Sequence, residues 1–461
     1  MRRLSGDILV VGLGRSGAAV VRYLLSCIVH GDSITITAVD GEDTPELLQL
    51  AEEYRAVGVR VELGCDRVDG HWGLGIVSPG IPPGTPLHIS AVETCDETIG
   101  ELELAFRMSS SPWVAVTGTN GKTTVTSLAS HLLECAGTIT ETVGNIGNPA
   151  IDIVEEAAPE AAIVAEVSSF QLHLVTEFHP RVAVLLNITP DHIDWHGSMA
   201  AYTADKTRIF ERMGAGDTAV IDVDDAGAAP YASEVELQGV RVVRVSRMHV
   251  PAGGAGLDGG MLVLDTDEGR VELIPARDLR IKGDHNISNA LAAAAAAHAF
   301  GADATALREG LASFAPIEHR IESVTTVGEV EYFNDSKATN PGAVLMALSA
   351  FRDRPVVLLL GGRNKDNLFD EIAEAARSCR GVVAFGEAAD EIVAAFDAAG
   401  TPVVGANGLA DATRIAHDLA LPGDAVLLSP ACASFDEFSG YAERGRTFKR
   451  MVLKMAEERR A

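Results

Sequence analysis

The stretch WVAVTGTNGKTT, residues 113–124, decides the fold of this chain. A short apolar run ends at Thr117, a glycine turn follows, and apolar residues then recur at helical spacing from Val125 to Leu133. This order predicts a buried strand, a glycine-rich loop and a helix start, which is the layout of a phosphate-binding loop. Small residues let backbone N–H groups surround a phosphate at the positive end of the helix. We therefore expect the segment to bind a nucleotide.

The lysine and the hydroxyl of this loop have distinct predicted roles. Lys122 is expected to reach the terminal phosphates, and the Thr123 hydroxyl to hold Mg²⁺. The loop is shorter than the general G-x-x-x-x-G-K-[ST] pattern, because Val116 stands where the first glycine should be. A plain glycine turn with a surface lysine is the alternative. The loop residues predicted to bind ATP are Gly118, Thr119, Asn120, Gly121, Lys122, Thr123 and Thr124.

Length and charge limit what the chain can be. At 461 residues it is long enough for about three domains. Its 65 acidic residues outnumber its 37 basic ones, for a net charge of −28 at pH 7. Such a charge repels DNA, RNA and anionic lipid, so we expect no nucleic-acid partner and no membrane insertion.

The cysteines and the N-terminus indicate the cytoplasm. The six cysteines are scattered and form no C-x-x-C pair, which is typical of reduced thiols and not of a disulfide framework or a zinc site. The chain enters a predicted strand by Ile8 with no signal-peptide pattern, and no apolar run reaches the roughly 18 residues that span a bilayer. We expect a cytoplasmic monomer.

Residues 1–112 are predicted to form a Rossmann-like domain. An apolar run from Ile8 to Val11 precedes the motif GLGRSG, and a second predicted strand ends at Asp40. A glycine motif with an acid about 20 residues later is the dinucleotide-binding fingerprint, but it specifies a phosphate-bearing ligand better than it specifies NAD. A strand and loop over residues 75–82 and a Ser-Ser-Ser-Pro linker follow.

The second predicted domain, residues 113–316, carries polar groups where its strands end. Residues 161–167 read as a buried strand that contains Glu166, and a buried carboxylate is costly unless it is paired or binds a metal. Residues 182–186 lead into a loop with His192. Because ligands of open α/β sheets bind beyond the carboxyl ends of the strands, Glu166 is a candidate Mg²⁺ ligand. A hydrogen-bonded core acid is the alternative.

One lysine lies on an apolar helix face. Met199, Tyr202, Lys206, Ile209 and Met213 recur at spacings of three and four residues and so share that face. A lysine that extends its ammonium to solvent is one interpretation. A lysine in an interior site, where desolvation lowers the pKa and makes the amine reactive, is the other.

The rest of the chain alternates strands, loops and helices. Residues 217–280 read as a β-rich insertion, and residues 283–289 open a helix over residues 290–300 that could present Asn286 and Asn289 to a base or ribose. Residues 317–461 repeat strand-loop-helix units, which predicts a second Rossmann-like domain with a parallel sheet covered on both faces.

Short segments along essentially the whole chain resemble the ATP-dependent Mur ligases of peptidoglycan synthesis. They fall in the order of that family, and the two segments NDSKATNP and SPACASFDEF are specific to its D-glutamate-adding branch. The branch that adds diaminopimelate or lysine would differ at both places. The other matching segments are GLGRSG, SPGIP, TGTNGKTT, GNIG, EVSSFQL, NITPDHIDWHG, GDHNISNALAA, HRIE and LGGRNK.

The resemblance implies a reaction. ATP would phosphorylate the terminal carboxylate of UDP-N-acetylmuramoyl-L-alanine, the amine of D-glutamate would attack the acyl phosphate, and phosphate would leave from a tetrahedral intermediate. The family positions for catalysis are Lys122, Glu166, His192 and Lys206, and those for Mg²⁺ are Thr123, Glu166 and His192. Lys206 matches a lysine that family members carbamylate with CO₂, giving an anion able to bind a metal. The family positions around ATP also include Asn286, Asn289, His319, Arg320, Asp335 and Lys337.

The resemblance also implies two further subsites. Many members carry an arginine two residues after the aspartate that matches Asp40, whereas this chain has Glu42, so its uridine contact must differ. The matching D-glutamate positions are Thr339, Lys365, Ser434 and Phe435. The matching UDP-substrate positions are Gly14, Ser16, Asp40, Ser78, Gly80, Asn145, Ser168 and Gln171.

Three other functions compete with this one. An NAD-dependent oxidoreductase built on GLGRSG leaves Lys122, Glu166 and Lys206 without a role. A non-enzymatic ATP-binding switch predicts ATP binding without phosphate release that depends on D-glutamate. Folylpolyglutamate synthase, a related ligase, would lack the N-terminal domain that residues 1–112 supply.

Overall fold

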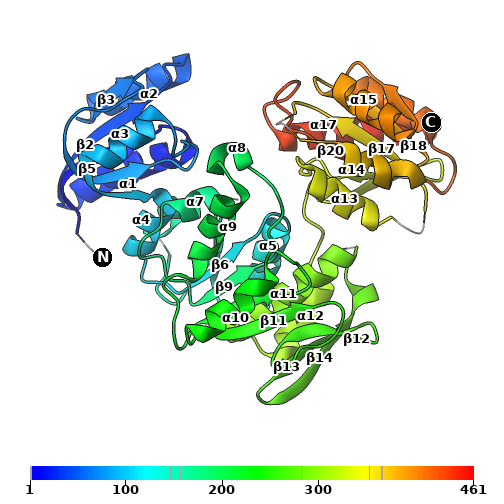
Figure 1. The fold of residues 1–461 in the computed structure, drawn as a ribbon, viewed down its shortest axis with the longest axis horizontal. Helices are drawn as coiled ribbons and strands as arrows, with labels where there is room; N and C mark the ends of the chain where they lie inside the picture. Colours follow the sequence, from blue (N-terminus) through cyan, green and yellow to red (C-terminus); the bar gives the residue numbers. More distant parts are fainter. Residues whose placement is uncertain are drawn as a thin grey trace. The chain divides into compact units, whose positions relative to one another are not determined.

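The structure is a computed structural model that describes residues 3–145, 148–155, 157–281, 283–351, 354–364 and 367–460. It contains three sheets (Figure 1). The chain divides into two compact units, one of residues 1–277 with 288–312 and the other of residues 278–287 with 313–461. Within the described residues, no helix is both long and apolar enough to cross a bilayer.

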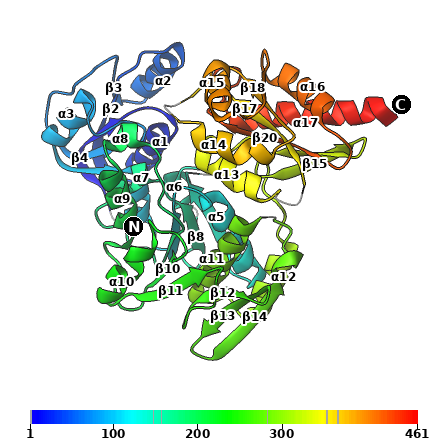
Figure 2. The same ribbon diagram turned by 45° about the vertical axis from the view of Figure 1, so that its right-hand side comes forward.

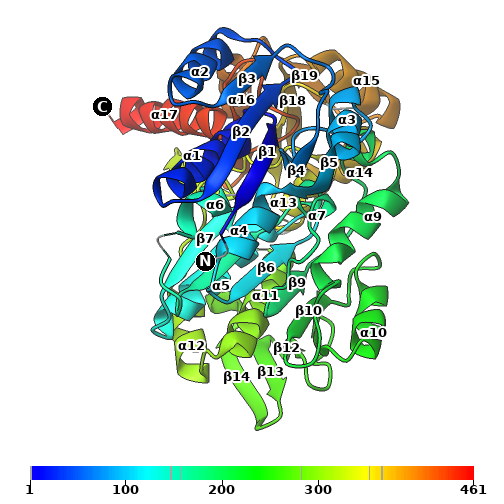
Figure 3. The same cartoon turned by 90° about the vertical axis from the view of Figure 1, so that its left-hand side faces the viewer.

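The first sheet is fully parallel and lies in the first unit. Its strand order is β3-β2-β1-β4-β5, with helices packed against it (Figure 3). Parallel strands covered on both faces need near-continuous apolar sequence, and the four residues that end β1, Ile8 to Val11, are all buried. The elements are β1 (Ser5–Val11), α1 (Arg15–Val29), β2 (Ser33–Asp40), α2 (Pro45–Ala56), β3 (Arg60–Leu63), β4 (Trp72–Val77), α3 (Pro86–Thr94) and β5 (Cys95–Gly100).

The central sheet of the first unit has nine strands in the order β14-β13-β12-β11-β10-β9-β6-β8-β7. It is parallel from β7 through β12, and β12 to β14 form an antiparallel extension. Its strands are β6 (Trp113–Thr117), β7 (Thr140–Gly144), β8 (Ala162–Glu166), β9 (Val182–Leu185), β10 (Thr218–Asp222), β11 (Arg241–Ser246), β12 (Ala255–Asp258), β13 (Met261–Thr266) and β14 (Gly269–Pro275).

Helices and 3₁₀ turns connect the strands of this sheet. The six-alanine helix α11 has small side chains, and those from Ala292 to Ala297 are all buried. The helices and turns are α5 (Lys122–Cys135), α6 (Ala150–Ile153), α7 (Ser169–His173), α8 (Ile193–His196), α9 (Met199–Thr207), η1 (Arg208–Phe210), α10 (Ala229–Leu237), η2 (Ala276–Asp278), α11 (Asp284–Phe300) and α12 (Ala304–Ser313).

The second unit holds the third sheet, in the order β15-β16-β20-β17-β18-β19. Its strands are parallel except for the edge strand β15, and the long helix α17 packs along β15 and β16 (Figure 2). The elements are β15 (Glu322–Val327), β16 (Val330–Asn334), α13 (Pro341–Ser349), β17 (Val356–Gly361), α14 (Asp370–Ala375), η3 (Ala376–Ser378), β18 (Gly381–Phe385), α15 (Ala389–Ala399), β19 (Val403–Gly405), α16 (Leu409–Leu419), β20 (Ala425–Ala431) and α17 (Tyr441–Arg460).

The helix α4 (Glu101–Met108) joins the first sheet to the central sheet. The buried carboxylate of Glu103 accepts backbone N–H bonds of 2.8–3.0 Å from three consecutive residues, 176–178. It also accepts a bond of 2.7 Å from the Nε of Arg107. The carboxylate of Glu101, buried as well, accepts the backbone N–H of Ile151 at 2.7 Å. Charge-assisted bonds of this kind are stronger than neutral ones, so they fasten the two sheets to each other.

The sequence placed most of these elements, with local differences. The region 217–280 is not only β-rich, since it contains the helix α10 (Ala229–Leu237). The helix that carries Asn286 begins at Asp284 rather than after Asn289. The helix with Lys206 ends at Thr207 and continues as a 3₁₀ turn, and Met213 lies beyond both. The third sheet is not wholly parallel, because β15 pairs antiparallel with β16.

Candidate active site

The strand β6 leads into the predicted phosphate-binding loop, and the helix α5 begins directly after it. Gly121, the N-cap residue, has a φ of 85°, a left-handed conformation that favours glycine. The Nζ of Lys122 donates hydrogen bonds of 2.8 Å to the backbone carbonyls of Gly118 and Thr119. The lysine therefore curls over its own loop. The other loop residues predicted to bind ATP are buried: Thr119, Asn120, Thr123 and Thr124.

Lys206 lies beside the same loop. Its side chain is buried, with 2% of the residue exposed, and its Nζ donates to the carbonyl of Gly118 at 3.0 Å. The ammonium also lies 4.6 Å from the ring centroid of Tyr202. Burial lowers the pKa of Lys206 well below its ordinary value, and the nearby charge of Lys122 lowers it further. The interior position of this lysine is confirmed, because its side chain is buried, while the reactivity of its amine stays a prediction.

Glu166 ends the buried strand β8, as the sequence predicts. One of its carboxylate oxygens accepts a hydrogen bond of 2.9 Å from the side-chain amide of Asn145. The backbone N–H of Asn145 donates to the carbonyl of Glu166 at 2.9 Å. The loop that begins at Asn145 is thus tied to the end of β8, while Ile146 and Gly147 of the motif GNIG lie outside the described residues.

His192 is the N-cap residue of α8 and adopts a φ of 53°. Left-handed backbone is uncommon for residues other than glycine and is found more often at functional sites. Its Nε2 lies 3.6 Å from a carboxylate oxygen of Asp191, and its ring meets that of Phe170 edge-on at 4.8 Å. The carboxylate of Glu166, the imidazole of His192 and the hydroxyl of Thr123 are all ligand types that Mg²⁺ proteins use or tolerate.

In the first sheet, the glycine motif forms a tight turn. A Cβ on Gly17 would lie 1.7 Å from the carbonyl oxygen of Gly12, so this position requires glycine. Asp40 closes the turn, because its carboxylate accepts the backbone N–H of Leu13 at 2.6 Å and that of Glu42 at 3.0 Å. The predicted UDP-substrate residues Gly14 and Ser16 lie at the start of α1, and Ser78 and Gly80 follow β4.

Ser168 and Gln171, also predicted to face the UDP substrate, bond to each other. The hydroxyl of Ser168 accepts the backbone N–H of Gln171 at 3.2 Å, and the side-chain oxygen of Gln171 accepts that of Ser168 at 3.0 Å. This is a capping box at the start of α7. Both residues therefore have a structural role that the sequence interpretation did not assign.

Asn286 and Asn289 lie in the first turns of α11 and are buried. A Cβ on Gly121 would lie 2.5 Å from the side-chain oxygen of Asn289, so this asparagine reaches the phosphate-binding loop. Their predicted contact with the nucleotide stays a prediction.

In the second unit, Asp335 lies just beyond β16 and is fully buried. Its carboxylate accepts bonds from the hydroxyl of Ser429 at 2.7 Å and the backbone N–H of Ile321 at 3.2 Å. Burial raises the pKa of Asp335 to about 7, while the hydroxyl of Ser429 and the charge of Arg320 act in the opposite direction. The predicted ATP residues Arg320, Asp335 and Lys337 thus share one edge of the third sheet with Thr339.

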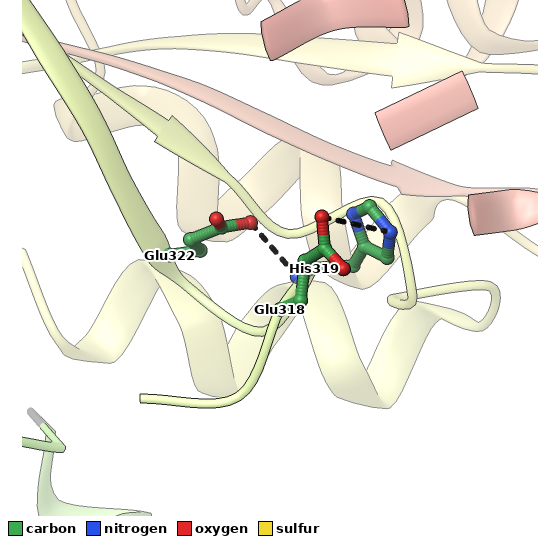
Figure 4. Close-up of side chains that lie close together, drawn as sticks. All are labelled: Glu318, His319 and Glu322. Atoms are coloured by element: carbon green, nitrogen blue, oxygen red, sulfur yellow. Dashed lines mark hydrogen bonds and ion pairs between the residues drawn. The ribbon is translucent and has the colours of Figure 1, made fainter. Parts of the chain in front are cut away.

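His319 lies inside the unit, and its predicted contact with ATP stays a prediction. It is 4% exposed, and its Nδ1 is 2.8 Å from the side-chain nitrogen of Asn334. Figure 4 shows His319 with Glu318 and Glu322, the one group of three potential metal ligands found among the described residues. The ammonium of Lys449 already binds both carboxylates, at 3.0 Å from Glu318 and in close contact with Glu322. We therefore interpret the group as an ion-pair network.

The residue that organises this edge of the third sheet, Arg444, was not predicted. Its guanidinium is completely buried and donates to the hydroxyl of Ser336 at 3.0 Å and to its carbonyl at 2.9 Å. It also donates to the carbonyls of Gly361, Cys432 and Ala433 at 3.1–3.4 Å. One side chain therefore fastens all three predicted ligand loops. Arg444 lies in a helix that begins just after the SPACASFDEF segment, but its spacing from the residues that it contacts gives no signal in the sequence.

Of the predicted D-glutamate residues, Thr339, Ser434 and Phe435 lie on these loops. Ser434 is buried and Phe435 is exposed, while Lys365 lies outside the described residues. Tyr441 was not predicted, yet its ring lies 5.5 Å from the ammonium of Lys337 and 6.0 Å from the ring of His319. An aromatic ring below a lysine can hold its charge in place by a cation–π contact.

Two family models match the chain. The Mur ligase middle domain matches residues 116–297, and the Mur ligase glutamate ligase domain matches residues 319–432. The solved structures that resemble this chain are 16–18% identical to it in sequence, so this resemblance shows the fold alone. The superposition on a pseudomurein peptide ligase type C from Methanothermus fervidus covers 97% of this chain and 100% of that chain, with a TM-score of 0.60. A folylpolyglutamate synthase from Mycobacterium tuberculosis covers only 75% of this chain and 92% of its own, with a TM-score of 0.58.

Curated relatives match nearly the whole length. A UDP-N-acetylmuramoylalanine--D-glutamate ligase of Pelotomaculum thermopropionicum is 42% identical over 97% of both chains. A protein of the same name from Salinibacter ruber is 40% identical over 96% of both chains. The loop, the buried lysine and the sheets described above therefore occur in a chain that belongs to the Mur ligase family.

Proposed function

We propose that this chain joins D-glutamate to UDP-N-acetylmuramoyl-L-alanine at the expense of ATP, giving ADP and phosphate, in the synthesis of peptidoglycan precursors. The similarity to D-glutamate ligases over nearly the full length supports this substrate choice. ATP-dependent ligation of an acid to an amino acid is the activity that this family membership supports. The domain division 1–112, 113–316 and 317–461, a cytoplasmic location and a monomeric state are parts of the same proposal.

One observation carries the chemical part of the proposal. The ammonium groups of Lys122 and Lys206 both donate to the carbonyl oxygen of Gly118, at 2.8 Å and 3.0 Å. Two ammonium groups on one carbonyl repel each other, and the carboxylates of Asp191, Glu166 and Asp205 offset this repulsion at Lys206 only in part. An anion on the loop, or the loss of one positive charge, would relieve the rest. A triphosphate on the loop would supply the first solution, and carbamylation of Lys206 would supply the second.

The reaction can be written with these residues. A carboxylate oxygen of the UDP substrate attacks the γ-phosphorus of ATP, the bond to the β-phosphate oxygen breaks, and ADP leaves. The amine of D-glutamate then attacks the acyl carbon, and inorganic phosphate leaves with the former carboxylate oxygen. Lys122 neutralises charge on the transferred group, and the backbone N–H groups of residues 118–121 orient it.

Mg²⁺ fits this site. Glu166 is a buried carboxylate at the carboxyl end of β8, and the imidazole of His192 and the hydroxyl of Thr123 follow neighbouring strands of the same sheet. We propose that these three groups hold the ion, which would shield the phosphate charges. A carbamate on Lys206, formed when its neutral amine adds to CO₂ and releases a proton, would be a further anionic ligand.

The third sheet would bind the amino acid. We propose that Ser434 and Thr339 contact the carboxylates of D-glutamate, together with Lys365 and Phe435. Arg320, Asp335 and Lys337, with Asn286, Asn289 and His319, would contribute to ATP binding. Because His319 is buried against Asn334, we expect it to shape the site more than to touch the nucleotide.

The alternatives make different predictions. An oxidoreductase built on the glycine motif would bind a nicotinamide cofactor, and it would leave Lys122, Glu166 and Lys206 without a role. A titration of nicotinamide fluorescence should therefore show no binding. The folylpolyglutamate synthase aligns with a smaller part of this chain than the D-glutamate ligases do.

The test is phosphate release from ATP in the presence of UDP-N-acetylmuramoyl-L-alanine, screened across D- and L-amino acids. We expect release with D-glutamate and little with L-glutamate or diaminopimelate. Release without any amino acid, or with none of those screened, would contradict the proposal.

A further inference from the structure

A chain of hydrogen-bonded polar side chains, most of them buried, begins at the residue before Lys206. The preceding residue, Asp205, accepts from the Nδ1 of His173 at 2.9 Å with one carboxylate oxygen and from the Nδ1 of His196 at 2.8 Å with the other. The Nε2 of His196 is 2.9 Å from the hydroxyl of Ser169. Asp205, Ser169 and the side chain of His196 are all buried.

This chain links three short helices. Ser169 and His173 lie on α7, His196 ends α8, and Asp205 lies on α9. Each helix also carries a group that the proposed function uses. The capping box of Ser168 and Gln171 opens α7, His192 caps α8, and Lys206 follows Asp205. A single carboxylate thus fixes the helices that carry the substrate-facing, metal-binding and carbamate positions.

Aromatic contacts also connect His196 to the two proposed site residues His192 and Lys206. The ring of Phe170 stacks on His196 at 5.4 Å and meets His192 edge-on at 4.8 Å. The ring of His196 also lies 5.1 Å from the ring of Tyr202, and the Lys206 ammonium lies 4.6 Å from the centroid of that tyrosine ring. Because close-packed rings transmit displacement, a shift of His196 would move both His192 and Lys206.

The order Ser169–His196–Asp205 resembles a nucleophilic triad but cannot act as one. Ser169 is 2% exposed, so no substrate carbonyl can reach its hydroxyl. When both Nδ1 atoms donate to Asp205, the Nε2 of a neutral His196 accepts the hydroxyl proton of Ser169. Every polar atom named in the chain then has a partner, as buried networks require. The arrangement is suited to holding geometry.

We propose that Asp205 is a positioning residue, which aligns Lys206 and His192 through His196. This inference rests on the proposed function, because it assigns those two residues to the metal site. It concerns residues to which the resemblance gives no role. The effect of an outer contact on a metal ligand is expected to be about 10- to 100-fold in activity or metal affinity.

The test compares Asp205→Asn with a matched control in the full-length protein. Asparagine keeps the shape of the side chain but offers one acceptor oxygen instead of two, so one histidine must change tautomer or lose its bond. The control is Asp217→Asn, because Asp217 also binds a histidine, His179, at 2.6 Å and caps a backbone N–H, at Gly214, in the same unit. It contacts none of the proposed ligands.

We expect Asp205→Asn to lower kcat about 10-fold or more and to raise the Mg²⁺ concentration for half-maximal rate several-fold. The KM for D-glutamate should not change. Both substitutions should lower the Tm by similar amounts. Asp217→Asn should leave kcat and the Mg²⁺ dependence unchanged. Wild-type kcat and Mg²⁺ dependence in Asp205→Asn would overturn the proposal, as would equal kinetic changes in the control.

A readout apart from turnover separates this proposal from the proposed function. Protein equilibrated with ¹³C-bicarbonate is examined by NMR for a carbamate carbon that is absent in Lys206→Ala. We expect Asp205→Asn to reduce its occupancy, and His196→Gln to act similarly, with no further loss in the double variant. Equal occupancy in wild type and Asp205→Asn would count against positioning. Failure of wild-type protein to release phosphate would refute the ligase activity alone.

Discussion

The two units contain buried cations, Lys206 and Arg444, that differ in how many hydrogen bonds stabilise their charge. Lys206 in the first unit is 2% exposed and donates to one carbonyl, that of Gly118, with Lys122 close by. Arg444 in the second unit is 0% exposed and donates to five oxygen atoms. Burial lowers the pKa of Lys206 well below its ordinary value but lowers that of Arg444 only to about 10.

The difference shows that burial alone does not mark a functional cation. Taking a charge out of water is costly, and the cost falls when hydrogen bonds replace the lost hydration. Arg444 has that replacement and holds loops together. Burial of Lys206 lowers its pKa, which increases the share of the neutral amine, and the neutral amine is the form that reacts with CO₂. We interpret Arg444 as a structural residue and Lys206 as a chemical one.

The largest expected effect separates these roles at Lys206. Lys206→Ala should reduce the rate of phosphate release about 10²- to 10³-fold, because it removes the proposed carbamate from the site. The Tm should stay the same or rise, because an incompletely hydrogen-bonded buried amine is removed. Bicarbonate should not restore activity. Turnover near that of wild type would end the carbamate proposal.

Arg444 should behave in the opposite way. Arg444→Met leaves buried carbonyls without donors and should lower the free energy of unfolding of the second unit by about 3 kcal/mol or more. Urea unfolding followed by circular dichroism measures this loss. Arg444→Lys keeps the charge but reaches fewer carbonyls, so it should lie in between. A fully stable Arg444→Met variant would remove the contrast with Lys206.

A third test asks whether a buried anion can also be structural. Glu103→Gln loses one of two acceptor oxygens at the junction of the first and central sheets and should cost about 2 kcal/mol of stability. The neighbour Glu177, whose side chain is 46% exposed, provides the control, since Glu177→Gln should change stability by less than about 0.5 kcal/mol. Equal losses of stability in both variants would show that the burial of Glu103 does not contribute to the free energy of unfolding.

The smallest expected effect is a pH dependence at Glu101. Burial raises its pKa from 4.5 to about 7. Between these values the folded protein keeps a proton that the unfolded chain has released, so stability falls as pH rises. The contribution of Glu101 should be about 1 kcal/mol smaller at pH 7 than at pH 6.

Glu101→Gln should make the loss of stability between pH 6 and pH 7 about 1 kcal/mol smaller in denaturation curves than it is in wild type. The rest of the loss should stay, because burial also raises the pKa of Asp335 to about 7. An unchanged pH dependence in the variant would show that Glu101 does not contribute to it.

Much of the fold could be predicted from the sequence because its signals are local. The phosphate-binding loop needs a strand, glycines and a helix start within about a dozen residues, and the structure has all three at residues 113–135. The helical spacing around Lys206 likewise places this lysine on an apolar face, where burial is one of two interpretations. Both signals depend on neighbours in the sequence and not on distant contacts.

The parts that escaped prediction depend on distant partners. Arg444 lies 108 residues from Ser336, to which it donates, and Asp205 lies 32 residues from His173. Nothing in the spacing of these residues indicates the contact. The capping box of Ser168 and Gln171 was also missed, although its local pattern is readable, because those residues were assigned to the substrate.

The most direct test of the central claim, that a carboxylate is activated by phosphoryl transfer at the loop of Lys122, follows an oxygen atom. UDP-N-acetylmuramoyl-L-alanine labelled with ¹⁸O in its terminal carboxylate is incubated with ATP, Mg²⁺ and D-glutamate, and the released phosphate is analysed by mass spectrometry. One ¹⁸O atom in each phosphate is the predicted result. Amide product accompanied by unlabelled phosphate, or no phosphate at all, would contradict it.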